Sequence, residues 1–265
     1  MPRIQLRAEV MVLAGTLCLW SMPAHAQAPR ERLPDRDVKR LIDQVDEGRD
    51  KFEGNLDNQV KNSTLTGANG DAKVSNVLQD YQDNTKKLQD RFTENYGASA
   101  EVTTVLKQAA AIDTFMQGTS GVMKGRKEWD AEAASLKHLG EAYGATFPLP
   151  EGATLHRTND KEVAAAADAI ATAADRFKDD LDKTSTLAKP DKQAAKKDVE
   201  LLIKHAESVK DHTSDGKPAA ADVRLLVEQA ARIQTFVGAH QMPTSNWEAV
   251  QASLDKVRQA FGLAK

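Results

Sequence analysis

The sequence predicts an all-α protein made of two tandem up-down-up-down four-helix bundles that are related by an internal repeat. Apolar residues recur at spacings of three and four through most of the chain after residue 34, which is the period of an amphipathic helix. The prolines after residue 34 and most of the glycines fall between these periodic segments, where they end helices. Similar segments also recur in the two halves in the same order, as expected of a duplicated unit.

The composition is compatible with this fold class and excludes some partners. The 265 residues include 28% charged, 40% hydrophobic and only 5% aromatic side chains, and the formal net charge is −3. The length accommodates one large domain or two of ordinary size. A core with few aromatic residues must come mainly from aliphatic ones, and this set of residues favours helices. The slight acidic excess gives no global attraction to nucleic acid, so we expect no nucleic-acid partner.

Residues 1–26 have the three parts of a cleaved signal peptide. The basic start contains Arg3 and Arg7. An apolar run of eleven residues follows at 10–20, and the small-x-small cleavage site is at residues 24–26. Eleven apolar residues rise about 16 Å as a helix, half of a hydrocarbon core of about 30 Å, which makes a permanent span the weaker alternative. We therefore expect a periplasmic or extracellular chain without a transmembrane anchor.

The first bundle is expected at residues 35–144, which contain four amphipathic segments. This range has no proline, and the next one after Pro34 is Pro148. Glycines separate the segments, and each segment has one apolar face. Because the links are short, neighbouring helices must run antiparallel. The four apolar faces are Val38, Leu41, Ile42, Val45, Phe52 and Leu56; Val74, Val77, Leu78, Tyr81 and Leu88; Val102, Val105, Leu106, Ala109, Ile112 and Phe115; and Trp129, Leu136, Leu139 and Tyr143.

A linker and a second bundle follow. Residues 145–160 contain two prolines and a glycine, a composition typical of an interdomain linker. The second four-helix bundle is expected at residues 161–263. Its three prolines, Pro190, Pro218 and Pro243, fall in its predicted loops, where the first half uses glycine.

The repeat is visible as four pairs of segments that match in order. The second member of each pair lies 125, 121, 121 and 118 residues after the first, so length differences fall only between the first and second helices and between the third and fourth. Aromatic residues occupy corresponding positions, which predicts that they belong to the two cores. The paired segments are 50–57 with 175–182, 78–88 with 199–209, 105–115 with 226–236, and 128–144 with 246–262.

Residue patterns typical of catalysis or of metal and cofactor binding are missing from the sequence. The single cysteine, Cys18, lies in the predicted signal, so the processed chain has no thiol for covalent haem or nucleophilic catalysis. No histidine follows a glutamate by three residues or another histidine by four, as carboxylate di-iron and zinc sites of helices require. No G-x-S-x-G turn occurs. We therefore assign no catalytic, cofactor or metal residue and expect a protein that is not an enzyme.

Histidines and an acidic residue at helical spacing are the nearest approach to a ligand set. Asp198, His205 and His212 are spaced by seven, which places them on one stripe but about 10.5 Å apart. That separation is too large for one metal ion, and we interpret the stripe as a polar helix edge. His138 lies between two core positions and is expected to face solvent.

Two residue types are shared by both halves beyond the aliphatic core. Gln108 and Gln229 flank the apolar faces, and we expect each to hydrogen-bond a neighbouring helix, with ligand binding as the alternative. Trp129 and Trp247 begin the last helix of each half. We expect them to close the bundle ends, with their N–H groups reaching loop carbonyls, and a binding role is the alternative.

The polar segment 61–71 has no sequence counterpart in the second half, and such unmatched loops often carry function. Taken together, the sequence predicts an exported, non-enzymatic helical-bundle protein that acts as a binding or structural module in the cell envelope, engaging another envelope or secreted protein. The alternative is a small-ligand sensor or carrier that binds in a bundle core or at the junction of the halves. The oligomeric state is left open.

Overall fold

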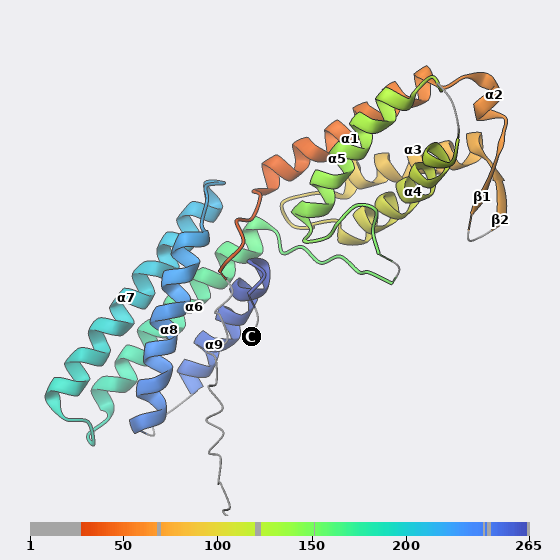
Figure 1. Cartoon of the computed structure of the whole chain (residues 1–265). Coiled ribbons are helices and arrows are strands. Elements are labelled where there is room, and N and C mark those ends of the chain that lie inside the picture. Colours follow the sequence, from red (N-terminus) through yellow and green to blue (C-terminus); the bar gives the residue numbers. More distant parts are fainter. Residues whose placement is uncertain are drawn as a thin grey trace, which may run out of the picture.

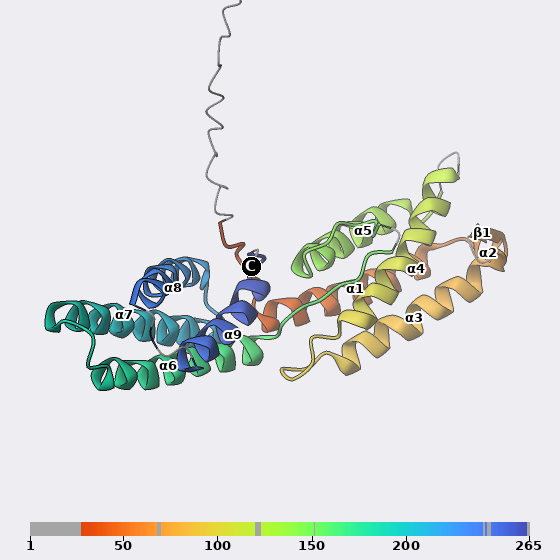
Figure 2. The ribbon, with the colours of Figure 1, turned by 90° about the horizontal axis from the view of Figure 1, so that it is seen from below.

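The computed structural model describes residues 28–67, 70–119, 123–150, 152–240, 242 and 245–263. The predicted signal, residues 1–26, lies outside this range. The described chain is mostly helical, which confirms the all-α class. Figures 1 and 2 show the helices in two groups that lie end to end. No helix in the described ranges is long and apolar enough to cross a membrane.

In the first group of helices α1 neighbours α3 and α5, and α4 neighbours the same two helices. Their apolar faces meet in one cluster of buried residues between Val38 and Tyr143. The Phe52 and Trp129 rings lie 4.9 Å apart in this core. The elements are α1 (Asp35–Asn55), α2 (Asn58–Lys61), β1 (Thr64–Gly67), β2 (Gly70–Lys73), α3 (Val74–Arg91), α4 (Ser99–Gly118) and α5 (Arg126–Ala142).

In the second group α6 neighbours α7 and α9, and α8 neighbours the same two helices. A separate cluster of buried residues runs from Val163 to Phe261. The first helix starts in a capping box, in which Asn159 and Glu162 bond each other's backbone N–H groups. The elements are α6 (Asp160–Lys183), α7 (Lys189–Ser214), α8 (Ala220–His240) and α9 (Ser245–Ala260).

The segment 61–71, expected to be a loop, is largely a β-hairpin. Strands β1 and β2 pair antiparallel, with Thr64 opposite Lys73 and Leu65 opposite Ala72. Threonine favours extended backbone, and Leu65 is buried against the first core. Leu65 therefore packs this short hairpin against the helices.

Both tryptophans are core residues, as predicted, with 1% of Trp129 and 2% of Trp247 exposed. The expected bond to a loop carbonyl is wrong. Trp129 Nε1 donates to Asp113 Oδ1 at 2.8 Å, and Trp247 Nε1 donates to Gln234 Oε1 at 2.6 Å. In each half the acceptor is a side chain of the preceding helix, because that helix packs within reach of the indole.

Candidate functional site

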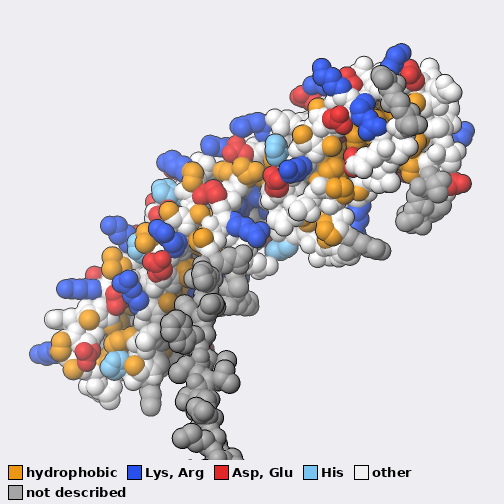
Figure 3. Space-filling view, in the orientation of Figure 1, with side chains coloured by type: hydrophobic (Ala, Val, Ile, Leu, Met, Phe, Trp, Pro, Cys, Tyr) orange, Lys and Arg blue, Asp and Glu red, His pale blue; other side chains and the backbone are white. Residues whose placement is uncertain are grey.

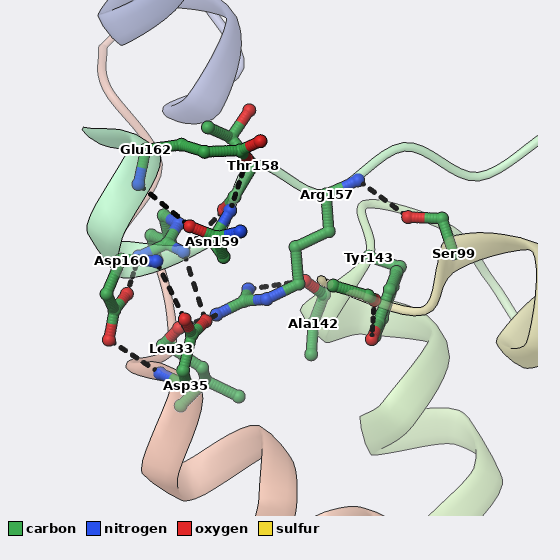
Figure 4. A network of polar contacts seen from close by, with 12 residues as sticks. Leu33, Asp35, Ser99, Ala142, Tyr143, Arg157, Thr158, Asn159, Asp160 and Glu162 are labelled. Carbon is green, nitrogen blue, oxygen red and sulfur yellow. Dashed lines mark hydrogen bonds and ion pairs between the residues drawn. The ribbon is translucent and has the colours of Figure 1, made fainter. Parts of the chain in front are cut away.

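The two groups of helices meet at the starts of α1 and α6. These helices begin with Asp35 and Asp160, and each carboxylate binds the first backbone N–H of the other helix. Asp35 N donates to Asp160 Oδ2 at 2.8 Å, and Asp160 N donates to Asp35 Oδ2 at 2.7 Å (Figure 4). A carboxylate is stabilising at a helix N-terminus, where unpaired N–H groups carry partial positive charge. The junction is thus a reciprocal cap between two helices.

Arg157, at the end of the segment predicted to be a linker, is buried at this junction. Its Nη2 donates to Asp35 Oδ1 at 2.8 Å and to the Leu33 carbonyl at 2.5 Å, and its Nη1 donates to the Ala142 carbonyl at 3.2 Å. Figure 4 shows its guanidinium between the start of α1 and the end of α5. Burial, and then the charge of Arg32, lower the pKa of Arg157. The arginine therefore links the segment just before α6 to α1 and α5 of the first half.

Arg157 is also held from its other side. Its backbone N–H donates to Ser99 Oγ at 3.0 Å, and its guanidinium carbon lies 5.9 Å from the centre of the Tyr143 ring. Tyr143 in turn donates its hydroxyl proton to the Gly97 carbonyl at 2.6 Å, and burial raises the pKa of this tyrosine. The segment before α6 is consequently fixed to α4 and α5, not free.

Arg32 makes the corresponding contacts from the first half. Its guanidinium binds the Asp160 carboxylate, reaches Asp35 Oδ1 at 3.3 Å and donates to the Thr158 carbonyl at 2.5 Å. The contacts mirror those of Arg157, which binds Asp35 and the carbonyl two residues before it. Two arginines and two aspartates thus compensate one another's charge.

The mirrored contacts follow from the sequence. Arg32 and Arg157 are 125 residues apart, as are Asp35 and Asp160, which is the same offset that relates Phe52 to Phe177. The pattern is R-x-x-D-[RK]-[DE]-V, at residues 32–38 and 157–163. This pattern was the signal that could have revealed the junction, and it lies just outside the segments in which the two halves are most similar in sequence.

The residues before α1 lie on the second half, although they precede the first. Arg30 N donates to the Phe261 carbonyl at 3.0 Å, and Glu31 Oε1 accepts from the Ala219 N–H at 3.2 Å. Residues 28–34, which we call the leading arm, and the linker therefore both cross the junction (Figure 1).

A cavity of about 610 Å³ opens beside this junction. Its walls come from the leading arm, α1, the end of α5, the end of the linker and the end of α9. The volume lies within the roughly 300 to 1,000 Å³ typical of small-molecule sites. Charged, amide and apolar side chains contribute to the wall, including Arg40, Gln44, His138, Glu141, Gln259 and Phe261. The cleft thus offers donors, acceptors and apolar surface from both halves.

Of the residues that the sequence singled out, His138 lies in the cleft wall and is exposed, as predicted. The expectation for the glutamines is confirmed, because both bind a neighbouring helix. Gln108 Oε1 accepts from Asn84 Nδ2 at 3.2 Å, and Gln229 Nε2 donates to Asp198 Oδ1 at 2.9 Å. Neither glutamine lines the cleft.

The polar stripe on α7 contacts α8. His212 Nδ1 lies 2.7 Å from Asp222 Oδ2, and Ser208 donates its hydroxyl proton to Asp222 Oδ1 at 2.8 Å. The carboxylate sits between serine and histidine, whereas a catalytic triad places the histidine between the other two. Within the described part of the chain, no three His, Cys, Asp or Glu side chains come together as metal ligands. The stripe joins two helices.

Comparison of the chain with protein-family models, with curated proteins and with solved structures finds no match.

Proposed function

We propose that the chain is an exported, non-enzymatic binding module in which two copies of a four-helix bundle enclose a ligand site at their junction. The observation that carries this proposal is the cleft of about 610 Å³ beside the reciprocal helix caps. Of the functions compatible with the sequence, small-ligand binding at the junction has this specific geometric support. A cleft between two folded units is a common place for such a site.

The duplication is supported by matching neighbours in the two halves. Helices α1, α3, α4 and α5 adjoin one another in the same order as α6, α7, α8 and α9. The aromatic pair Phe52 and Trp129 lies 4.9 Å apart, and its counterpart Phe177 and Trp247 lies 5.4 Å apart. One ancestral bundle, used twice, accounts for both sets of contacts.

Export to the periplasm or the extracellular space is supported by the signal-like residues 1–26 and by the absence of cysteine from residues 27–265.

The charges on the visible face of the molecule support binding in a cleft over binding across a broad surface. Figure 3 shows acidic and basic side chains interspersed over both halves. Such a surface offers no broad field of one sign that would attract a polyanion.

The ligand site can be tested by native mass spectrometry of the chain purified from its own cells. We expect a retained small molecule that is lost in Gln259→Ala, because Gln259 is an exposed cleft residue on α9. Gln193→Ala is the matched control, because Gln193 is exposed on α7 and does not line the cleft. A clean protein mass, or equal retention by both variants, would contradict the proposed site.

A protein partner is the second candidate function. Leu201 on α7 and Leu225 on α8 are 44% and 39% exposed, on helices that neighbour each other. Crosslinking in cells that recovers an envelope protein through these leucines, together with a clean protein mass, would favour this function over ligand binding.

A further inference from the structure

Three polar side chains are buried in the core of the first half. Arg49 of α1, Tyr81 of α3 and Glu132 of α5 are each at most 1% exposed. Tyr81 donates its hydroxyl proton to Glu132 Oε1 at 2.5 Å. The other carboxyl oxygen, Oε2, has no hydrogen-bond partner in the described structure. A buried oxygen without a partner destabilises the fold, so this carboxyl group needs an explanation.

The carboxyl group lies between the backbones of α1 and α5. A Cβ atom added at Gly48 of α1 would lie only 2.1 Å from Glu132 Oε2 and 3.7 Å from the Glu132 Cα. Glycine is unfavourable in a helix interior by about 1 kcal/mol relative to alanine. At this position it leaves the space that the carboxyl group occupies. The state of Glu132 therefore bears directly on how closely α1 and α5 can pack.

Burial disfavours the ionised form of Glu132, and the charges around it offset only part of that cost. Arg49 is already paired on its own helix, with Asp46 at 2.5 Å and Asp50 at 2.8 Å. An ionised Glu132 would add a third negative charge beside one arginine. From α3 the facing group is the neutral Tyr81 hydroxyl. Asp46 and Asp50 pair with Arg49 on its own helix, so Arg49 offsets only part of the cost of burying an ionised Glu132.

The remaining neighbour, α4, adds no compensating charge. Its Asp113 is engaged by Trp129 Nε1, one turn before Glu132 on α5. The pKa of Glu132 is raised to about 8: burial is the largest cause and Asp46 adds to the rise, while the Tyr81 hydrogen bond and Arg49 lower the pKa. The folded first half therefore favours a neutral carboxyl group.

The second half shows that this polar cluster is not needed for the fold. At the offsets of 125, 121 and 118 that relate the halves, every polar position of the cluster is apolar. The counterparts are all buried. They are Ala173 for Gly48, Ala174 for Arg49, Leu202 for Tyr81 and Val250 for Glu132.

We propose that Glu132 is a proton-sensitive contact between α1 and α5, which closes the first half when neutral and loosens this helix pair when ionised. Both helices also form walls of the junction cleft, through Arg40 and Gln44 of α1 and His138 of α5. His138 lies six residues after Glu132, about 9 Å along the helix. Loosening the pair therefore changes the first-half wall of the cleft; this consequence rests on the function proposed above.

The direction of the pH effect follows from linkage. The folded state holds the proton up to about pH 8, whereas an unfolded glutamate loses it near pH 4.3. Stability from this group is complete below the unfolded pKa and is lost as pH rises toward the folded pKa. One proton released on unfolding changes the folding equilibrium constant about tenfold per pH unit over that range.

The test compares urea unfolding of the parent chain and Glu132→Gln between pH 5 and 9. The processed chain lacks Trp20, which leaves Trp129 and Trp247 as one fluorescent reporter in each half. We expect the ratio of the folding constants, variant over parent, to rise about tenfold per pH unit and to level off near pH 8. Asp130→Asn is the matched control, because Asp130 is exposed on the same helix and does not line the cleft, and its ratio should stay flat. A flat ratio for Glu132→Gln would overturn the proposal.

Two further measurements separate the parts of the proposal. If Glu132→Gln does not fold, carboxyl ¹³C NMR of the parent chain replaces it: a glutamate that titrates above pH 7 supports the proposal, and titration of every glutamate below pH 6 overturns it. Hydrogen exchange at pH 8.5 tests the effect on the cleft. We expect weaker protection of α1 and α5 in the parent than in Glu132→Gln, and equal protection would refute that effect. None of these readouts involves a ligand, so they stand apart from the test of the cleft.

Discussion

Replacing Arg157 with alanine should loosen the junction and destabilise the protein. The guanidinium donates to the Asp35 carboxylate at 2.8 Å and to the Leu33 and Ala142 carbonyls at 2.5 and 3.2 Å. Removing one member of a buried ion pair costs about 3 to 5 kcal/mol, because the other charge is left uncompensated. Asp35 keeps Arg32 at 3.3 Å. We therefore expect a loss near the lower end of that range, about 3 kcal/mol.

Urea unfolding followed by circular dichroism measures this loss, and small-angle X-ray scattering reports whether the two halves separate. Arg176→Ala is the matched control, because Arg176 is exposed on α6, and a surface substitution of this kind should change stability by less than about 0.5 kcal/mol. A variant Arg157→Ala that is as stable as Arg176→Ala, with unchanged scattering, would refute the assignment of Arg157 as the residue that fixes the junction.

Three other substitutions test the packing. Gly48→Ala should cost about 1 to 3 kcal/mol of stability by overpacking, because the new Cβ would meet Glu132 Oε2 at 2.1 Å. In urea titrations, the double variant with Glu132→Val should recover part of this stability. If the losses of the two single variants simply add in the double variant, the contact is contradicted. Trp247→Ala should cost about 3 to 5 kcal/mol, since only 2% of the side chain is exposed, and melting curves equal to those of the parent would reject its core role. His212→Ala should cost about 1 kcal/mol through the lost 2.7 Å contact with Asp222, and a change below 0.3 kcal/mol in calorimetry would show that the contact contributes nothing.

The helices were predictable because each has one apolar face with helical period. Val38, Val45 and Phe52 are all buried, with at most 1% exposed, as their spacing of seven indicates. The hairpin was not predicted, since its strands have only four residues each, which is too short for a strand period to stand out in the sequence. The indole acceptors Asp113 and Gln234 were also missed, because helix periodicity says which side faces inward but not which residue of the next helix lies opposite.

The candidate site was likewise predictable only in part. A junction between the halves was open as a ligand site from the sequence, but the residues that build it were not identified. Arg32 and Arg157 look like ordinary surface charges until the chain is folded, when each meets an aspartate at the start of the other half's first helix. Glu132 was missed for a related reason: a glutamate on a charged helix normally faces solvent. Its signal was the apolar Val250 at the matching position of the aligned segment 246–262.

An experimental structure of the protein purified from its own cells would show whether the junction between the two halves is a ligand site. We expect density for a bound small molecule in the junction cleft, bounded by α1, α5 and α9 and contacting Gln44 or Gln259. A retained molecule bound elsewhere, or a cleft filled by the surface of a partner protein, would contradict the claim that the junction is a ligand site.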